Sequence, residues 1–147
     1  MDLILKKVNS KNLFSVRSKV LRKNASYEYC KFEGDDRTDS IHIGAYQNNV
    51  ILGGVSLIKN KSTRIELENC YQLRGMCVLK NSQKKGIGQK LLQSAEKTCR
   101  NLNVDYIWMN AREKVVNFYL KLNYTDLGQT YIIEGIGKHS CLYKNLK

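Results

Sequence analysis

Residues 71–92 read YQLRGMCVLKNSQKKGIGQKLL, and this stretch decides the fold of the chain. It begins with an apolar segment typical of a strand, continues through a short polar loop, and ends in a run with the apolar spacing of a helix. A helix that starts directly after a strand and a turn exposes its first backbone N–H groups and the positive end of its dipole. Such a helix end binds anions, and the favoured ligand is a phosphate or a diphosphate.

Two glycines and two lysines in the loop strengthen this interpretation. Gly86 and Gly88 let a ligand approach the main chain without meeting a Cβ atom. Lys84 and Lys85 add full positive charges beside the partial charges of the helix end. The alternative reading of the same glycines is a tight turn that binds nothing.

Two common phosphate-binding motifs do not fit the loop. A dinucleotide fingerprint requires a third glycine, and that position holds Leu91. A P-loop ends in Gly-Lys-Ser/Thr, whereas residues 88–91 read Gly-Gln-Lys-Leu. The pattern that remains is Gln-x-x-Gly-x-Gly over residues 83–88, opening a helix after an apolar strand.

Length and composition limit the class of protein. A chain of 147 residues suits a single domain, which we place at residues 1–147. The net charge of +12 invites a nucleic-acid interpretation, but the lysines are spread along the chain and no nucleic-acid motif is present. Nucleic acid is therefore disfavoured as a partner. A positive field would instead steer a polyanionic cofactor toward its site.

The cysteines and the hydropathy pattern indicate a compartment. Five cysteines are an odd number without C-x-x-C spacing, so disulfides and a zinc site are disfavoured and no metal is expected. No apolar run approaches the roughly 20 residues of a membrane span, and the N-terminus lacks the charged-then-apolar pattern of a signal peptide. We expect a cytoplasmic protein without a membrane partner.

Periodicity predicts an alternation of strands and helices along the rest of the chain. Strands are expected at 2–8, 41–46, 50–58, 71–79, 106–109, 125–133 and 140–146, and the polar stretch 59–69 is a candidate strand extension. Helices are expected at 11–24 with Ser10 as N-cap, from the glycine loop to about 102, and at 114–122. The strand, helix and strand over 71–109 predict a parallel βαβ unit.

A second block of sequence follows the strand at 106–109. Residues 110–113 read NARE, and residues 117–124 read NFYLKLNY. Together with the Gln-x-x-Gly-x-Gly loop, this block resembles the GCN5-related N-acetyltransferase (GNAT) superfamily, whose late helix reads Phe-Tyr-x-Lys-x-Gly-Phe. Position 123 is asparagine where glycine is usual, and both residues accept the left-handed conformation of a helix C-cap.

The resemblance implies a fold and a co-substrate. The fold is α/β (α+β): a mixed, mostly antiparallel sheet of six to seven strands with about four flanking helices, splayed between strands 4 and 5. It also implies that a homodimer can form. The implied activity is an acyltransferase that moves an acetyl group from acetyl-CoA directly to an amine. The implied acetyl-CoA contacts are Met76, Cys77, Val78, Gln83, Lys84, Lys85, Gly86, Ile87, Gly88, Gln89, Asn110 and Asn117.

The resemblance assigns proton transfer to a few residues. Tyr119 aligns with the general acid that protonates the departing thiolate, and its alternative is a core tyrosine with a hydrogen-bonded hydroxyl. His139 and Glu68 are the preferred candidates for the base that accepts the amine proton; a surface role explains His139 equally well, and an exposed strand face is the more usual explanation of Glu68. Asp35 and Asp36 either attract the amine or form a solvated acidic turn.

Two other functions stay open at this point. A CoA-binding module without transferase activity would bind acetyl-CoA and release no free CoA with any amine. A basic nucleic-acid-binding domain would show salt-dependent retention on DNA or RNA. The sequence does not identify the acceptor amine.

Overall fold

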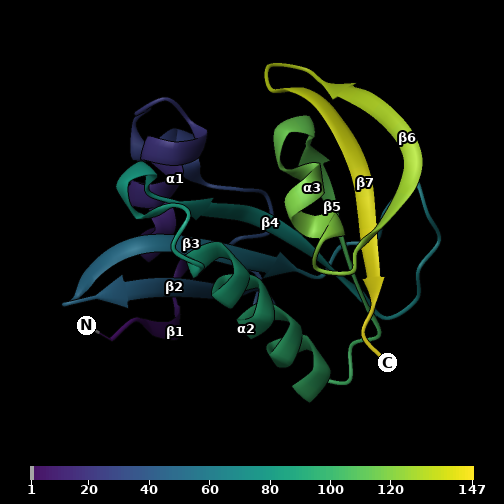
Figure 1. The fold of residues 1–147 in the computed structure, drawn as a ribbon, viewed down its shortest axis with the longest axis horizontal. Helices are drawn as coiled ribbons and strands as arrows, with labels where there is room; N and C mark the ends of the chain where they lie inside the picture. Colours follow the sequence, from purple (N-terminus) through teal and green to yellow (C-terminus); the bar gives the residue numbers. More distant parts are fainter. Residues whose placement is uncertain (1) are drawn as a thin grey trace. The chain divides into compact units, whose positions relative to one another are not determined.

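The computed structural model describes residues 2–147. Its seven strands hydrogen-bond in the order β1-β2-β3-β4-β5-β7-β6, and three α-helices and four short 3₁₀ helices connect them (Figure 1). The chain divides into two compact units. The first unit comprises residues 2–58 and Leu73–Thr98, and the second comprises Lys59–Gln72 and Cys99–Lys147. The expectation of one domain stays a prediction.

The first unit is an antiparallel sheet with helices. Its register aligns Lys6 with Gly44 between β1 and β2, and Ile43 with Val55 between β2 and β3. Asn48 and Asn49 both have positive φ, which is the conformation that a two-residue hairpin turn demands. The elements up to this point are β1 (Ile4–Val8), η1 (Ser10–Leu13), α1 (Phe14–Leu21), η2 (Tyr27–Cys30), β2 (Ile41–Gln47) and β3 (Val50–Ile58).

The first helix begins and ends earlier than the sequence predicted. Asn9 rather than Ser10 is the N-cap, because its side chain and that of Asn12 each accept a backbone N–H in a reciprocal capping box. The segment opens as 3₁₀ helix and continues as α1 to Leu21. Lys23 and Asn24 then adopt positive φ, which ends the helix before residue 24.

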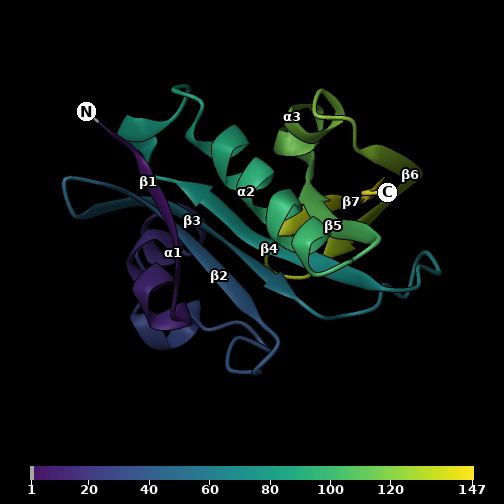
Figure 2. The same ribbon diagram turned by 90° about the horizontal axis from the view of Figure 1, so that it is seen from below.

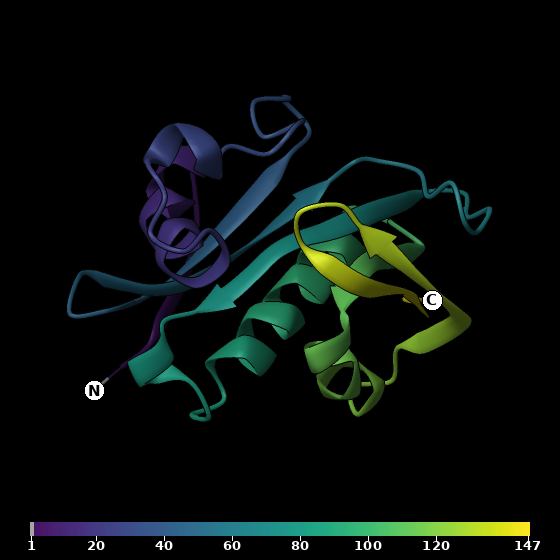
Figure 3. The same ribbon diagram turned by 90° about the horizontal axis from the view of Figure 1, so that it is seen from above.

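Glycines allow the strands and helices of the first unit to approach closely. A Cβ atom on Gly53 would lie 2.6 Å from the Cys77 carbonyl oxygen, and one on Gly54 would lie 2.6 Å from Leu13 Cδ2. A side chain at either position would therefore clash with its neighbour. Leu13 and Cys77 belong to a core cluster with Val16. Helices α1 and α2 (Ile87–Asn101) cover opposite faces of this part of the sheet (Figures 2 and 3).

Strand β4 (Cys70–Val78) contributes to both units. Its residues Cys70–Gln72 pair in parallel with Tyr106–Trp108 of β5 (Tyr106–Arg112). The predicted parallel pairing is confirmed, and this ladder covers only the first three residues of each strand, as expected for strands predicted to separate further along. The Gly75 backbone, with φ of +64°, makes an irregularity at the centre of β4.

The second unit is built round an antiparallel set of strands. Strand β7 (Gly137–Asn145) lies between β5 and β6 (Thr125–Ile133), and the β6–β7 hairpin forms the yellow-green end of the chain (Figure 1). Its core cluster contains Leu67, Cys70, Trp108 and Cys141. The remaining elements are η4 (Glu113–Val115) and α3 (Val116–Leu120). Asn123 follows this helix and has a positive φ of 72°.

Two sequence expectations for this unit need correction. Residues 59–69 form no strand, because the Ser62 hydroxyl accepts the N–H groups of Arg64 and Ile65 and so bends the chain. Strand β7 begins at Gly137 rather than at residue 140, since Ile133 aligns with Gly137 across a tight hairpin. In residues 2–147 no helix combines the length and apolar character needed to cross a membrane.

Candidate active site

The first unit carries the strand, loop and helix start that the sequence singled out. Met76 and Val78 are half-buried and Cys77 is buried at the end of β4. The strand continues directly into the loop, where the Leu79 N–H donates to the Leu52 carbonyl oxygen at 2.8 Å. A short 3₁₀ helix, η3 (Lys80–Ser82), leads to Gln83. The main chain of this segment is therefore fixed against β3 before the glycines begin.

The glycine loop presents an accessible helix end. Gly86 has a φ of +83°, and a Cβ atom built on it would meet nothing within 4 Å. The first α-helical bond runs from the Lys90 N–H to the Gly86 carbonyl oxygen at 3.1 Å, so the N–H groups of the preceding residues have no partner within the helix. Lys84, Lys85 and Gln89 are exposed beside them, whereas Ile87 is buried and anchors the helix. This arrangement suits an extended anion.

Gln83 has a structural contact of its own. Its side-chain Nε2 donates to the Val78 carbonyl oxygen at 2.9 Å, which closes the loop onto the end of β4. The sequence grouped Gln83 with the residues that touch the ligand. In the structure the Gln83 amide donates to the carbonyl oxygen of Val78, which is one of the three strand residues expected to contact acetyl-CoA.

The second unit holds a compact polar group on β5, β6 and β7. The Tyr131 hydroxyl donates to Asn110 Oδ1, so the Asn110 amide nitrogen keeps two N–H donors for other partners. The Arg64 guanidinium carbon lies 3.3 Å from the centre of the Tyr131 ring. Burial raises the pKa of Tyr131 to about 12, so its phenol stays a neutral donor at physiological pH.

His139 belongs to the same group and has a defined tautomer. Its side chain is buried, and Nδ1 lies 2.7 Å from the Gly137 carbonyl oxygen. A carbonyl oxygen only accepts, so Nδ1 carries the hydrogen and the neutral ring has its lone pair on Nε2. Within residues 2–147 no hydrogen-bond partner for Nε2 is present, and the ring stacks on Tyr131 with an interplanar angle of 19°. His139 therefore has the form of a base.

Glu68, the other predicted base, lies in a different environment. Its side chain is 77% exposed and pairs at 3.5 Å with Lys61, which is also at the surface. This environment does not distinguish Glu68 from an ordinary surface carboxylate. Between the two predicted bases, the geometry favours His139.

Helix α3 places Asn117 and Tyr119 differently. Asn117 is exposed, whereas Tyr119 is buried and packs edge-on against Phe118 and Tyr124, with ring centres 5.1 and 5.7 Å away. The buried ring fixes the direction of the Tyr119 hydroxyl. A general acid requires such an orientation.

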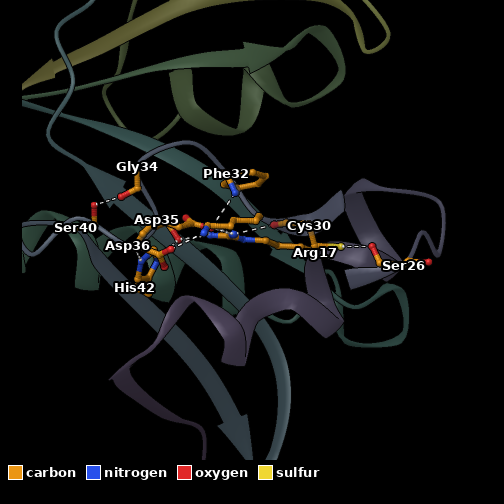
Figure 4. Close-up of polar contacts among 11 residues, drawn as sticks. Arg17, Ser26, Cys30, Phe32, Gly34, Asp35, Asp36, Ser40 and His42 are labelled. Carbon is orange, nitrogen blue, oxygen red and sulfur yellow. Dashed lines mark hydrogen bonds and ion pairs between the residues drawn. The ribbon is translucent and has the colours of Figure 1, made fainter. Parts of the chain in front are cut away.

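A buried ion pair in the first unit was missed by the sequence reasoning. Arg17 of α1 is fully buried and donates to both Asp35 oxygens, at 2.6 and 3.1 Å (Figure 4). Asp35 is therefore neither a solvated residue nor a free attractor for an amine, and that expectation is wrong, while Asp36 is exposed and pairs with Lys31. Arg17 falls on the apolar stripe of its helix, between Val16 and Val20, and this position was the available signal.

The ion pair is part of a directed hydrogen-bond network. The Ser56 hydroxyl oxygen accepts from Arg17 Nη2 at 2.8 Å and lies 2.6 Å from His42 Nδ1. His42 Nε2 lies 2.9 Å from the Asp35 carbonyl oxygen, so Nε2 donates there and Nδ1 accepts from Ser56. His42 is thus a buried residue whose two ring nitrogens are both hydrogen-bonded. Within residues 2–147 no group of three or more His, Cys, Asp or Glu side chains is arranged to hold a metal ion.

Comparison with known proteins places this geometry in a family. Residues 11–124 match the model of the Acetyltransferase (GNAT) family. The chain is 30% identical to an uncharacterized N-acetyltransferase, YitI of Bacillus subtilis (strain 168), over 145 residues that cover 99% of this chain and 97% of that protein. The chain therefore belongs to the GNAT family, and the resemblance of the two sequence blocks is confirmed.

Solved structures have the same fold. A putative N-acetyltransferase from Lactobacillus plantarum superposes with a TM-score of 0.79 at 16% identity, covering 100% of both chains. An aminoglycoside 6'-N-acetyltransferase complexed with coenzyme A gives a TM-score of 0.78 at 15% identity, covering 98% of this chain and 97% of that one. The mixed, mostly antiparallel sheet predicted from the sequence is confirmed.

Proposed function

We propose that this protein is an N-acetyltransferase that moves an acetyl group from acetyl-CoA to an amine. The observation that carries the proposal is the exposed start of α2 behind the Gly86 loop, in a chain that belongs to the GNAT family. A related fold has been solved with coenzyme A bound, which supports acetyl-CoA as the acyl donor. The five cysteines are free and buried, which suits the reducing cytoplasm as the site of the reaction.

The first unit supplies the donor contacts in this proposal. The N–H groups of residues 86–89 and the side chains of Lys84 and Lys85 bind the diphosphate. The main chain of Met76, Cys77 and Val78 binds the pantetheine arm. Gln83 acts on the donor indirectly, because it fixes the end of β4 to the loop. Asn110 and Asn117 are the proposed donor contacts of the second unit.

The second unit supplies the proton transfers. His139 Nε2 removes a proton from the substrate ammonium, and the free amine attacks the thioester carbonyl carbon. A new C–N bond forms, the C–S bond breaks, and the CoA thiolate leaves. The Tyr119 hydroxyl gives a proton to that thiolate, and the phenolate so formed takes the second proton that the nitrogen loses as the amide forms. Direct transfer requires no acyl-cysteine, and burial raises the pKa of Cys77 to about 12, which leaves its thiol unreactive.

A pair of double variants tests the donor site. Lys84→Gln with Lys85→Gln removes both charges from the loop, and we expect the acetyl-CoA dissociation constant to rise about two- to thirtyfold. Lys19→Gln with Lys97→Gln removes the same charge from exposed positions of α1 and α2 and serves as the matched control. Calorimetry measures the acetyl-CoA dissociation constant of both double variants. An equal rise in the two proteins would mean that only the overall positive charge of the protein attracts acetyl-CoA.

An assay of free CoA release tests the activity itself. We expect thiol release with at least one amine from a panel of polyamines, aminoglycosides, amino acids and N-terminal peptides. Acetyl-CoA binding without release across the panel would instead identify a silent CoA-binding module. The absence of acetyl-CoA binding would refute the proposal.

A further inference from the structure

Three arginine side chains surround the buried ring of Phe32. The guanidinium carbon of Arg17 lies 3.8 Å from the ring centre, that of Arg74 lies 4.7 Å away, and that of Arg22 lies 5.3 Å away. All belong to the first unit: Arg17 is in α1, Arg22 follows α1, and Arg74 is in β4. We call these four residues the Phe32 cluster.

Among residues 2–147, only one carboxylate is bonded to this cluster, and Arg17 uses it. Asp35 Oδ2 accepts from Arg17 Nη1 and from the Phe32 N–H at 2.8 Å, and its Oδ1 accepts from Arg17 Nη2. Arg22 donates to the carbonyl oxygen of its neighbour, Leu21. Arg74 has no hydrogen bond and no ion pair within residues 2–147. The Phe32 cluster and Asp35 together carry a surplus of two positive charges.

The unpaired charge of Arg74 is costly where it lies. The side chain is half-buried, and this desolvation lowers the pKa of Arg74 below its ordinary value. The charges of Arg17 and Arg22 lower it further, against opposing contributions from Asp35 and Glu33. A guanidinium with five free donors beside two like charges gains more from an incoming anion than one already paired.

The position of Arg74 on β4 relates this charge to the reaction. Arg74 precedes Gly75 and lies two residues before Met76, where the proposed pantetheine contacts begin. Phe32 also lines an open pocket of about 680 Å³, whose other lining residues are Glu28, Lys31, Glu33, Gly34, Asp36 and Arg37. Arg74 therefore lies on the donor strand, and its neighbour Phe32 borders space that a small molecule can enter.

We propose that Arg74, assisted by Arg22, binds a carboxylate of the acceptor, so that the amine acetylated is an amino acid or a similar zwitterion. The planar guanidinium of Arg74 matches a carboxylate in two parallel hydrogen bonds. This inference rests on the proposed acetyltransferase function. It excludes polyamines and aminoglycosides as the preferred acceptors, because they lack an anionic group.

Matched acceptors test the inference. Each of the twenty amino acids is compared with its own carboxamide, which keeps the amine and removes the negative charge. For the best amino acid we expect kcat/KM to exceed that of its carboxamide by about ten- to a hundredfold, the range that one charge-assisted hydrogen bond provides. In Arg74→Gln the ratio should fall to about one, while Arg74→Lys should keep part of it.

Two controls separate this inference from folding and from the function. Lys19→Gln removes one exposed charge from α1 and should leave the ratio unchanged. Calorimetry with N-acetyl amino acids and N-acetyl carboxamides measures carboxylate binding without turnover. We expect wild type to bind only the carboxylates, and Arg74→Gln, with its acetyl-CoA affinity intact, to bind neither.

The outcomes divide clearly. Equal use of amino acids and carboxamides by wild type, or an unchanged ratio in Arg74→Gln, overturns the inference while the acetyltransferase function stands. A change of KM for acetyl-CoA alone in Arg74→Gln also overturns it, because the anion then belongs to the donor. Arg74-dependent binding of N-acetyl amino acids without any CoA release supports the carboxylate site and refutes the function.

Discussion

The buried Arg17–Asp35 pair predicts a large loss of stability when its charge balance is broken. Asp35→Asn keeps the shape of the side chain and removes the charge that faces Arg17, and both side chains are completely buried. A cation left unpaired in such a place costs about 3–5 kcal/mol. The whole free energy of unfolding of a natural domain is only about 5–15 kcal/mol. The melting midpoint should therefore fall by roughly 6–20 °C.

Urea unfolding followed by far-UV circular dichroism measures this loss. The midpoint should drop with the slope unchanged, because the exposed surface on unfolding stays the same. Asp36→Asn is the matched control: Asp36 is the next residue and its partner Lys31 is at the surface, so little change is expected. Replacing the pair with Arg17→Met and Asp35→Leu should recover much of the stability. A loss below about 1 kcal/mol in Asp35→Asn, or a double variant no more stable than the single, would refute this account of the pair.

The two proposed proton-transfer residues give further predictions. Tyr119→Phe should lower kcat about a hundred- to ten-thousandfold and change the acetyl-CoA dissociation constant less than twofold, with Tyr124→Phe as the control for loss of a buried hydroxyl; unchanged turnover removes Tyr119 from the mechanism. His139→Ala should lower kcat strongly, since no imidazole then remains to accept the proton of the amine. Glu68→Gln should change kcat little, and the opposite pattern would make Glu68 the base.

Local chemistry made the order of elements predictable from the sequence. The Asn48-Asn49 turn, the alternating strand before it and the helix after the glycine loop each follow from rules that act over a few residues. The bounds of β3 and β6 agree with the predicted 50–58 and 125–133 for the same reason. The anion-binding character of the loop needed only the strand, the glycines and the helix in sequence.

Contacts between distant residues were less accessible to the same reasoning. Asp35 is followed by another acidic residue and looks like part of a surface turn, yet its partner Arg17 lies 18 positions earlier. The Tyr131 contact to Asn110 spans 21 positions and depends on β7 lying between β5 and β6. Periodicity describes which face a residue occupies. It does not describe which side chain from another element shares that face.

The turns of this chain also affect its unfolded state. Six of the eight non-glycine residues with positive φ in residues 2–147 are asparagines, at positions 24, 48, 49, 69, 103 and 123. Glycine would adopt the positive φ of each of these turns with less strain, but it would also widen the range of conformations open to the denatured chain. Asparagine therefore adds a small backbone strain to the native state and lowers the conformational entropy of the unfolded state. Because these two effects oppose each other, replacing one of these asparagines with glycine should leave the free energy of unfolding nearly unchanged.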